Sequence, residues 1–235
     1  MMAGSLDRLA AFDAAAAHKV RIRIAGLLLV FLLVFGGGGS PSPLAELACE
    51  LATALAICAW VLLVPATPDS GASAVSARPA LAVAVLLVVI PIAQLVPLPP
   101  GLWQAMPGRE AVRDSLALVD AAHTWRPISI APLATLSSLL SLLPPLTIML
   151  MVSRLDDNGR LTVITLIAGF GLVSVLLGTL QMASAGGNAL LFYGQPDRGV
   201  LFGFQANRNT EADILLCGLI ALGALRGAGR RFRGR

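Results

Sequence analysis

The sequence predicts an all-α protein, a polytopic bundle of about six transmembrane helices with both termini in the cytoplasm. Three observations predict this fold class. Of the 235 residues, 57% are hydrophobic and only 13% are charged, whereas soluble domains usually carry roughly 25% charged residues. The charged residues lie between long apolar runs, as is typical of runs embedded in lipid. Lys and Arg also favour alternate connecting segments, which is the pattern that orients helical membrane proteins.

Six apolar runs are the expected spans. They are predicted at about 22–39, 44–64, 79–97, 133–153, 161–183 and 209–225, within a transmembrane domain of residues 21–225. About 20 apolar residues cross the hydrocarbon, so the first run needs the glycines after Phe35 and snorkelling of Arg21 and Arg23. The last run crosses only if its helix begins near Asn209; otherwise it is a tilted or re-entrant half-helix. Pro144-Pro145 predicts a kink in the fourth span.

The distribution of basic residues sets the expected topology. With the N-terminus inside, twelve of the 17 Lys and Arg residues lie in cytoplasmic segments and five in external segments, in line with the positive-inside rule. Residues 1–20 are then a cytoplasmic segment, 98–132 and 184–208 are external loops, and 226–235 are a basic tail that contacts anionic lipid. Because topology accounts for the positive charge, no nucleic-acid partner is expected.

Local patterns add expectations for the loops and helix faces. Residues 109–120 are predicted to form a short amphipathic helix on the outer membrane surface, and Trp103 and Tyr193 are suited to the interface. Turns are predicted at 157–159 and 185–188. Two stripes of small residues are read as helix contact surfaces; they are Ala48, Ala52 and Ala56, and Ser174 and Gly178.

Two stretches outside the membrane carry a family resemblance. One runs from Pro97-Leu98-Pro99 through Pro107-Gly108-Arg109-Glu110 to Trp125-Arg126-Pro127-Ile128-Ser129, Pro132 and Thr135; the other is Gly203-Phe204-Gln205-Ala206-Asn207-Arg208-Asn209, followed by Ala212-Asp213. In this order they resemble the N-terminal half of the O-antigen ligase and polymerase superfamily of bacterial envelope membrane proteins. The resemblance covers roughly residues 20–225, and its motifs are short.

The resemblance implies a multi-pass protein of the bacterial inner membrane in envelope polysaccharide and lipopolysaccharide synthesis. The family moves a glycan from undecaprenyl diphosphate to an acceptor hydroxyl, which belongs to a lipid A core sugar for a ligase and to another glycan for a polymerase. This chain departs from the family at Thr210 and Glu211, where relatives have His and an aromatic residue. Relatives also have a second half, whose large periplasmic loop carries essential Arg and His. We therefore expect a partial, glycosyltransferase-like protein that lacks the catalytic loop and has a C-terminal half as partner.

The proposed chemistry requires groups that bind a diphosphate. Arg suits phosphate because its planar fork binds two oxygens. Arg208 is the first candidate, since it is flanked by Asn207 and Asn209 at a predicted helix N-terminus, which favours anions. The alternative is a purely structural role, in which these Asn residues, or Thr210, cap the helix while Arg208 faces water or lipid headgroups.

Two further charged residues complete the candidate site. Arg126 is the second candidate for a diphosphate contact, with stacking on Trp125 as the alternative role. Asp213 is an acid about one turn into a span, where charge is costly, so it is a candidate charge partner for Arg208 or for a helix of a missing half. His123 is exposed in the loop with no evident partner and is the weakest catalytic candidate.

Other function classes remain open. No metal-ligand cluster or phosphate-loop motif is visible, so no metal or cofactor is expected, and three cysteines in apolar runs are expected to pack as small apolar residues. The alternatives are a non-catalytic truncated membrane protein and half of a membrane transporter or flippase. A transporter needs a polar path, and the third to fifth spans contain no ionisable residue, which argues against it.

Overall fold

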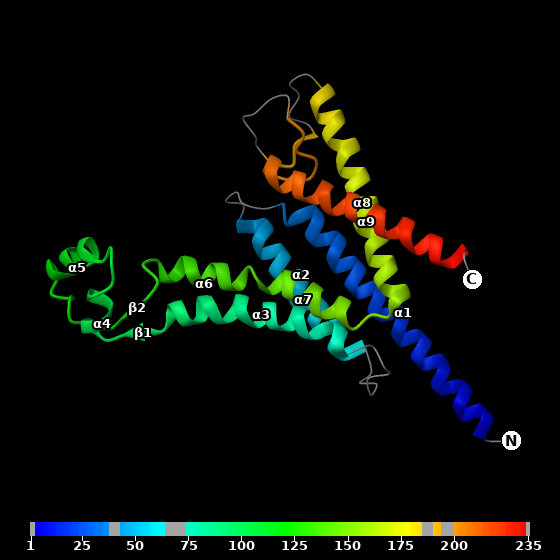
Figure 1. Ribbon diagram of the computed structural model, residues 1–235, viewed down its shortest axis with the longest axis horizontal. Helices are drawn as coiled ribbons and strands as arrows, with labels where there is room; N and C mark the ends of the chain where they lie inside the picture. The colour runs from blue at the N-terminus through cyan, green and yellow to red at the C-terminus, as the bar shows by residue number, and fades with distance from the viewer. Residues whose placement is uncertain (1–2, 38–42, 64–73, 185–189, 194–199, 234–235) are drawn as a thin grey trace. The chain divides into compact units, whose positions relative to one another are not determined.

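The computed structural model describes residues 3–37, 43–63, 74–184, 190–193 and 200–233. Apart from two strands of two residues each, its regular elements are all α-helices, as predicted (Figure 1). In chain order they are α1 (Ala3–Phe35), α2 (Pro43–Leu63), α3 (Ala74–Leu95), β1 (Pro97–Leu98), α4 (Pro100–Gln104), α5 (Glu110–Ala117), β2 (Arg126–Pro127), α6 (Pro132–Leu140), α7 (Leu143–Ser153), α8 (Asp157–Ala183) and α9 (Arg208–Arg233).

Four helical stretches are long and apolar enough to cross a membrane. They are Leu44–Leu63, Pro132–Ser153, Asp157–Ala183 and Arg208–Gly229, and only 11% to 28% of each is buried inside the protein. Lipid is the solvent that suits such outward-facing apolar side chains, so the chain is a helical membrane protein. The helix of the last predicted span begins at Arg208, early enough for a rise of about 33 Å over the 22 residues to Gly229.

The two other predicted spans lie on helices that do not meet the same criteria. In α1, the apolar residues 24–35 follow Lys19, Arg21 and Arg23, and that part rises only about 18 Å. In α3, the apolar stretch is Leu81–Leu95, which rises about 22 Å. Four of six predicted spans are therefore found in the described residues, and the first and third remain predictions.

One predicted turn is wrong. Residues 157–159 form the first turn of α8 and are not a loop, because Asp156 caps the helix: its Oδ1 accepts from the backbone N of Gly159 at 2.7 Å. Helix α9 continues through the predicted basic tail as far as Arg233, and α1 begins at Ala3 within the predicted N-terminal segment; the cytoplasmic location of both segments stays a prediction. Alanine is frequent in residues 3–20 and arginine in residues 226–233, and both favour helix. The turn expected at 185–188 lies outside the described residues.

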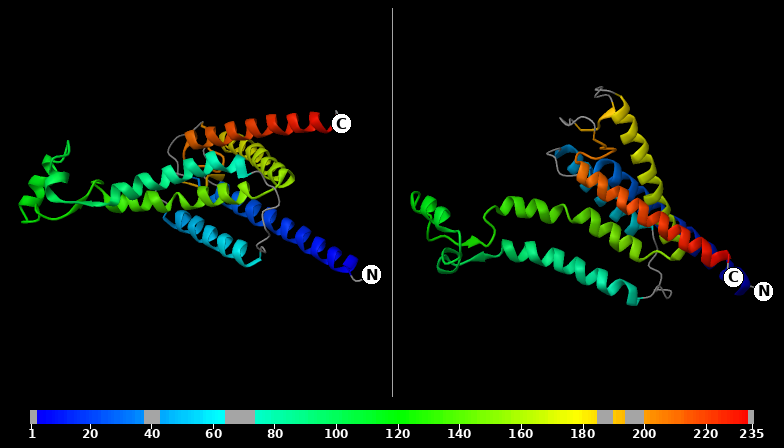
Figure 2. Two further views of the ribbon diagram at one scale, coloured as in Figure 1. Left: turned by 60° about the horizontal axis from the view of Figure 1, so that its bottom comes forward. Right: turned by 45° about the horizontal axis from the view of Figure 1, so that its top comes forward.

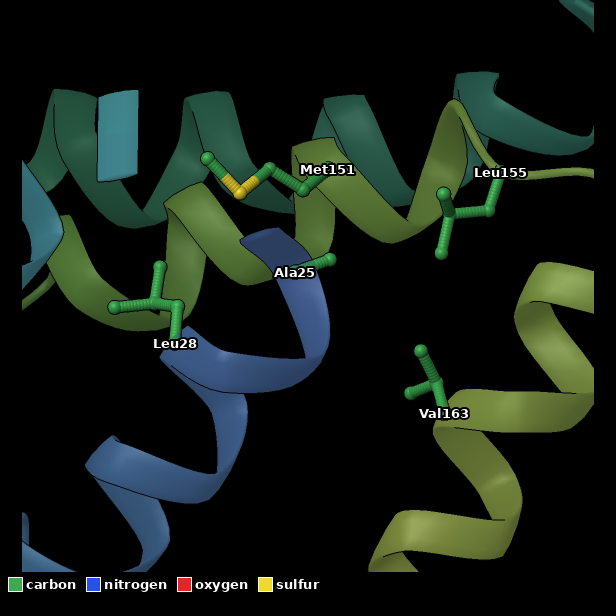
Figure 3. Packing of buried hydrophobic residues seen from close by; sticks show 5 residues of the cluster. All are labelled: Ala25, Leu28, Met151, Leu155 and Val163. Atoms are coloured by element: carbon green, nitrogen blue, oxygen red, sulfur yellow. The ribbon is translucent and has the colours of Figure 1, made fainter. Parts of the chain in front are cut away.

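The chain forms two compact units, and the larger one comprises Met1–Ala72 and Pro144–Arg235. Its core joins α1, α7, α8 and the connection after α7 (Figure 3). The buried residues are Ala25, Leu28, Met151, Leu155 and Val163. From α2, Ala52, Ala56 and Trp60 pack against this cluster, which confirms that part of the alanine stripe of α2 is a contact surface.

Helices α8 and α9 cross within the same unit, where two glycines allow a close approach (Figure 1). A Cβ atom added to Gly171 would lie 3.3 Å from the Cα of Gly218. Small residues at such a crossing let two backbones pack directly, as is common in membrane proteins. This crossing fixes α9 beside the half of α8 that carries the candidate site.

The smaller unit, Ser73–Leu143, is a helical hairpin with a small cap (Figure 2). Helices α3 and α6 lie side by side, and β1 pairs antiparallel with β2, placing Leu98 opposite Arg126. Trp103 was expected at the membrane interface, but it is fully buried, and its Nε1 donates to the carbonyl of Thr124 at 3.0 Å. The amphipathic helix predicted at 109–120 is present as α5, one residue shorter at its N-terminal end and three residues shorter at its C-terminal end.

The predicted kink at Pro144-Pro145 is a break between helices. Helix α6 ends at Leu140 and α7 begins at Leu143. The turn between them lies at Ser141 and Leu142. Proline lacks the backbone N–H that a continuous helix needs, so two prolines at the start of α7 favour a new helix over an extension of α6.

Candidate functional site

The segment 200–207, which precedes α9, is fastened by two glutamine side chains. Gln181 of α8 accepts from the backbone N of Gly203 at 2.9 Å and donates to the carbonyl of Gly203 at 2.7 Å. Gln205 is buried and donates to the carbonyl of Leu33 in α1 at 3.1 Å. Next to it, the backbone N of Ala206 donates to the carbonyl of Gly37 at 3.0 Å. Neutral amides thus satisfy backbone groups that water cannot easily reach.

A buried carboxyl group lies beneath this segment. Glu211, in the first turn of α9, is 1% exposed, and its Oε1 accepts from Ser174 Oγ of α8 at 2.7 Å. Its second oxygen, Oε2, is buried and has no hydrogen-bond partner among the described residues. No Lys, Arg or His of the described chain forms an ion pair with it. A buried acid with one hydrogen bond and no cation is unusual in a folded protein.

The electrostatic balance at Glu211 is unfavourable for a charge. Burying an ion without a partner costs several kcal/mol, even after the surroundings relax. The N-terminus of α9 offsets only about 0.3–1 kcal/mol of that cost, up to about 2 in buried geometries. Ser174 supplies a single hydrogen bond. The neutral acid is the form of Glu211 that this geometry suits best.

Gly203 covers the carboxyl group of Glu211 directly. Its φ of 56° is in the left-handed region, which glycine adopts at little cost. A Cβ atom at Gly203 would lie 2.7 Å from both carboxyl oxygens of Glu211 and would collide with Ser174 Oγ. Glycine is therefore required at this position twice, once for its backbone conformation and once for space.

The three predicted residues at the start of α9 lie together and are exposed. Asn207 caps the helix, since its Oδ1 accepts from the backbone N of Asn209 at 2.8 Å and its carbonyl accepts from the backbone N of Glu211 at 3.0 Å. Asn209 and Thr210, the alternative caps, lie inside α9. The Arg208 side chain is exposed, and no described residue forms an ion pair with it.

Asp213 is exposed on α9 and forms no ion pair with Arg208 in the described part of the chain. Asp213 therefore leaves the charge of Arg208 available to an outside partner. The acid that the fold buries is its neighbour Glu211, two residues earlier.

Arg126 belongs to the smaller unit, in β2. Its side chain is half-buried, and Nε donates to Thr124 Oγ1 at 3.3 Å. The more strongly held cation of this loop is Arg109, which is 4% exposed and donates to the carbonyls of Pro127 and Ile128. Sequence analysis did not identify Arg109 as a site residue. Its place in the Pro107–Glu110 motif was the signal that could have identified it.

Tyr193 anchors the same region of the larger unit to α1. Its hydroxyl donates to the carbonyl of Phe35 at 3.2 Å, and the side chain is half-buried. Burial raises the pKa of Tyr193 above its usual value, and the neighbouring Cys49 adds to the shift. Beside it, Phe192 and Phe170 both pack against Phe204. Phe170 and Phe192 therefore help to hold the segment 200–207 in place, while Tyr193, which was expected at the interface, is hydrogen-bonded to α1.

Four polar residues of this region were not identified from sequence as site residues. They are Ser174, Gln181, Gln205 and Glu211. For two of them the signal was present, because Ser174 and Gln181 interrupt an otherwise apolar helical stretch, where a polar side chain usually has a specific partner. Only the fold shows that all four converge on Gly203 or its neighbours.

No protein family, no characterised protein and no solved structure gives a significant match to this chain. In the described ranges, no group of three or more His, Cys, Asp or Glu is placed to hold a metal ion. The arrangement offers two kinds of chemistry: an exposed cation at a capped helix N-terminus, suited to anions, and a buried acid under a glycine turn.

Proposed function

We propose that this chain is the N-terminal half of an O-antigen ligase-like or polymerase-like unit of the bacterial inner membrane. In this proposal it helps transfer a glycan from undecaprenyl diphosphate to an acceptor hydroxyl, with a C-terminal half supplying the catalytic loop. The observation that carries it is Arg208, exposed and without an ion-pair partner in the described chain, at the capped start of a helix long enough to cross a membrane. The motif that carries the resemblance includes this residue.

The chemistry at Arg208 fits a diphosphate leaving group. Its guanidinium presents a planar fork of donors that matches two phosphate oxygens. The N-terminus of α9 adds backbone N–H groups and a partial positive charge in the same place. Asn207 uses its Oδ1 for the helix cap, which leaves its side-chain NH₂ group as a further donor. Groups that hold the developing charge of the diphosphate favour its departure from the sugar.

The proposal includes six spans with both termini in the cytoplasm. Helices α1 and α3 would complete the first and third spans, with Arg21 and Arg23 reaching the headgroups. In this topology the loops 98–132 and 184–208 face the same external compartment. Arg126, in the loop of the smaller unit, remains the second arginine proposed for a phosphate contact.

Binding of undecaprenyl diphosphate to the detergent-solubilised full chain tests this proposal. Arg208→Ala is expected to weaken binding about tenfold or more, because a hydrogen bond to a charged group contributes about 1.5–3 kcal/mol. Arg113→Ala is the matched control, since Arg113 is exposed and pairs with the neighbouring Asp114. Undecaprenol, which lacks phosphate, separates headgroup binding from binding of the tail. Equal affinity of the wild type and Arg208→Ala for the diphosphate would remove the site.

A second candidate function, half of a membrane transporter, is favoured by one observation. Glu211 is a buried acid in a helix long enough to cross the membrane, and such residues mark proton and ion paths. Reconstituted vesicles with an imposed proton gradient distinguish the two functions. Proton flux that is lost in Glu211→Gln would favour the transporter, whereas the transferase proposal expects no flux.

A further inference from the structure

The buried carboxyl group of Glu211 has no role in the proposed glycan transfer. We propose that Glu211 is an intramembrane proton-binding site, and that its proton holds the segment 200–207 against α8. This inference does not rest on the proposed function. Three observations carry it: Glu211 is 1% exposed, its Oε2 has no hydrogen-bond partner among the described residues, and the backbone of Gly203 lies directly on the group.

The surroundings offer no described cation to balance a negative charge. On α8, Asp157 and Arg160 lie in the first turn, more than about 20 Å along the helix from Ser174. On α9, Arg208 and Asp213 are both exposed. The part of α1 that reaches the segment, residues 24–35, contains no charged residue.

Tyr193 beside the segment uses its hydroxyl in the hydrogen bond to the carbonyl of Phe35, and neither it nor Cys49 beside it nor Cys217 of α9 can supply a positive charge. An ionised Glu211 would therefore remain uncompensated in a buried site. A proton, which comes from water and returns to it, removes that charge with a single O–H bond. Ser174 Oγ remains the hydrogen-bond partner of the neutral acid.

The covering glycine couples the proton to the conformation of the segment. An ionised carboxyl group can regain its hydration only if Gly203 moves away from it. That movement breaks the paired hydrogen bonds between Gly203 and Gln181, which are 2.9 Å and 2.7 Å long. Because the segment continues into the cap residue Asn207, release of Gly203 also loosens the start of α9. The bound state is thus closed and protonated, and the open state is hydrated and ionised.

Infrared spectroscopy tests for the proton directly. The full chain in lipid vesicles at neutral pH is expected to show the carbonyl stretch of a protonated carboxylic acid. The band should be lost in Glu211→Gln and kept in Asp213→Asn, which changes an exposed acid on the same helix. A wild-type spectrum without the band, or a band that survives Glu211→Gln, would overturn the proposal.

Hydrogen exchange of the peptide that covers residues 200–206 tests the coupling. After correction for intrinsic rates, exchange in the wild type should rise with pH by up to about tenfold per pH unit. This rise is expected where Glu211 is protonated in the closed state and ionised in the open state, because opening then releases one proton. Glu211→Gln, which cannot ionise, should show no such rise, and Asp213→Asn should behave as the wild type. The same rise in Glu211→Gln would show that another group controls the segment and would refute the coupling.

Discussion

Gln181 and Gly203 are joined by two hydrogen bonds, one in each direction, so a side-chain amide of α8 pairs with a backbone peptide as a neighbouring strand would. The segment 200–207 has no strand partner of its own in the described structure. The pairing therefore replaces regular secondary structure at the point where the chain turns into α9.

Gln181→Ala should destabilise the larger unit. The substitution leaves the N–H and the carbonyl of Gly203 without partners, and an unsatisfied buried group costs about 1–3 kcal/mol. Unfolding in a denaturing detergent series measures the loss. Gln94→Ala, which truncates an exposed glutamine of α3, should leave stability nearly unchanged. A Gln181→Ala protein as stable as the wild type would show that the pairing contributes little.

Gly203→Ala should be more harmful than most glycine substitutions in this chain. Alanine at a φ of 56° costs roughly 1–2 kcal/mol for the backbone alone, and its Cβ would also press on Glu211 and Ser174. Gly169→Ala is the matched control, because nothing lies within 4 Å of the added atom in α8 and alanine favours helix by about 1 kcal/mol. Thermal unfolding should therefore shift in opposite directions for the two variants.

Gly171→Leu should disrupt the crossing of α8 and α9. Even a Cβ atom at this position lies 3.3 Å from the Cα of Gly218, so a larger side chain forces the helices apart. Overpacking of this kind typically costs about 1–3 kcal/mol. Gly169→Leu, on an open face of α8, is expected to be tolerated. Equal stability of the two leucine variants would mean that the crossing does not contribute to the fold.

Arg109→Ala should loosen the cap of the smaller unit. Arg109 is 4% exposed and donates to the carbonyls of Pro127 and Ile128, and leaving these groups unsatisfied costs about 1–3 kcal/mol. Proteolysis of the loop 98–132 and quenching of tryptophan fluorescence report on the buried Trp103. Arg113→Ala removes an exposed arginine of the same loop and should change neither signal.

Tyr193 allows a pH prediction that phenolate absorbance can measure without interference, since it is the only tyrosine of the chain. Burial raises the pKa of Tyr193 in the folded protein, so the unfolded chain ionises first as pH rises. This contribution to stability is present below the ordinary tyrosine pKa of about 10 and is lost as pH rises through the folded value. Phenolate absorbance should titrate later than free tyrosine, and Tyr193→Phe should remove this part of the pH dependence.

The long apolar helices were predictable because hydropathy over some 20 residues leaves few alternatives. Span 161–183 followed from the sequence and lies within α8, whereas a start near Asn209 was one of two alternatives for the last span, and α9 begins at Arg208. The helix boundaries that are set by capping residues could not be predicted from the sequence. Asp156 was one of several polar residues that could begin a helix, and only the position of the backbone N of Gly159 selects it.

The candidate site was only partly predictable, for a physical reason. Asn207, Arg208 and Asn209 are consecutive, so their proximity at the start of α9 is guaranteed by the chain. Glu211 and Ser174 are 37 residues apart, and their contact depends on how α8 and α9 cross. A single sequence contains the glycines that allow the crossing, but it does not state which faces of the two helices meet.

Amide side chains carry no charge, and this has a practical consequence for the fastening of 200–207. Gln181 and Gln205 attach the segment to α8 and α1 through neutral hydrogen bonds, which mobile ions do not screen as they screen pairs of surface charges. High ionic strength should therefore weaken anion binding at Arg208 while leaving the segment in place. Salt concentration thus separates anion binding at the exposed N-terminal end of α9 from the neutral hydrogen bonds that hold the segment before it.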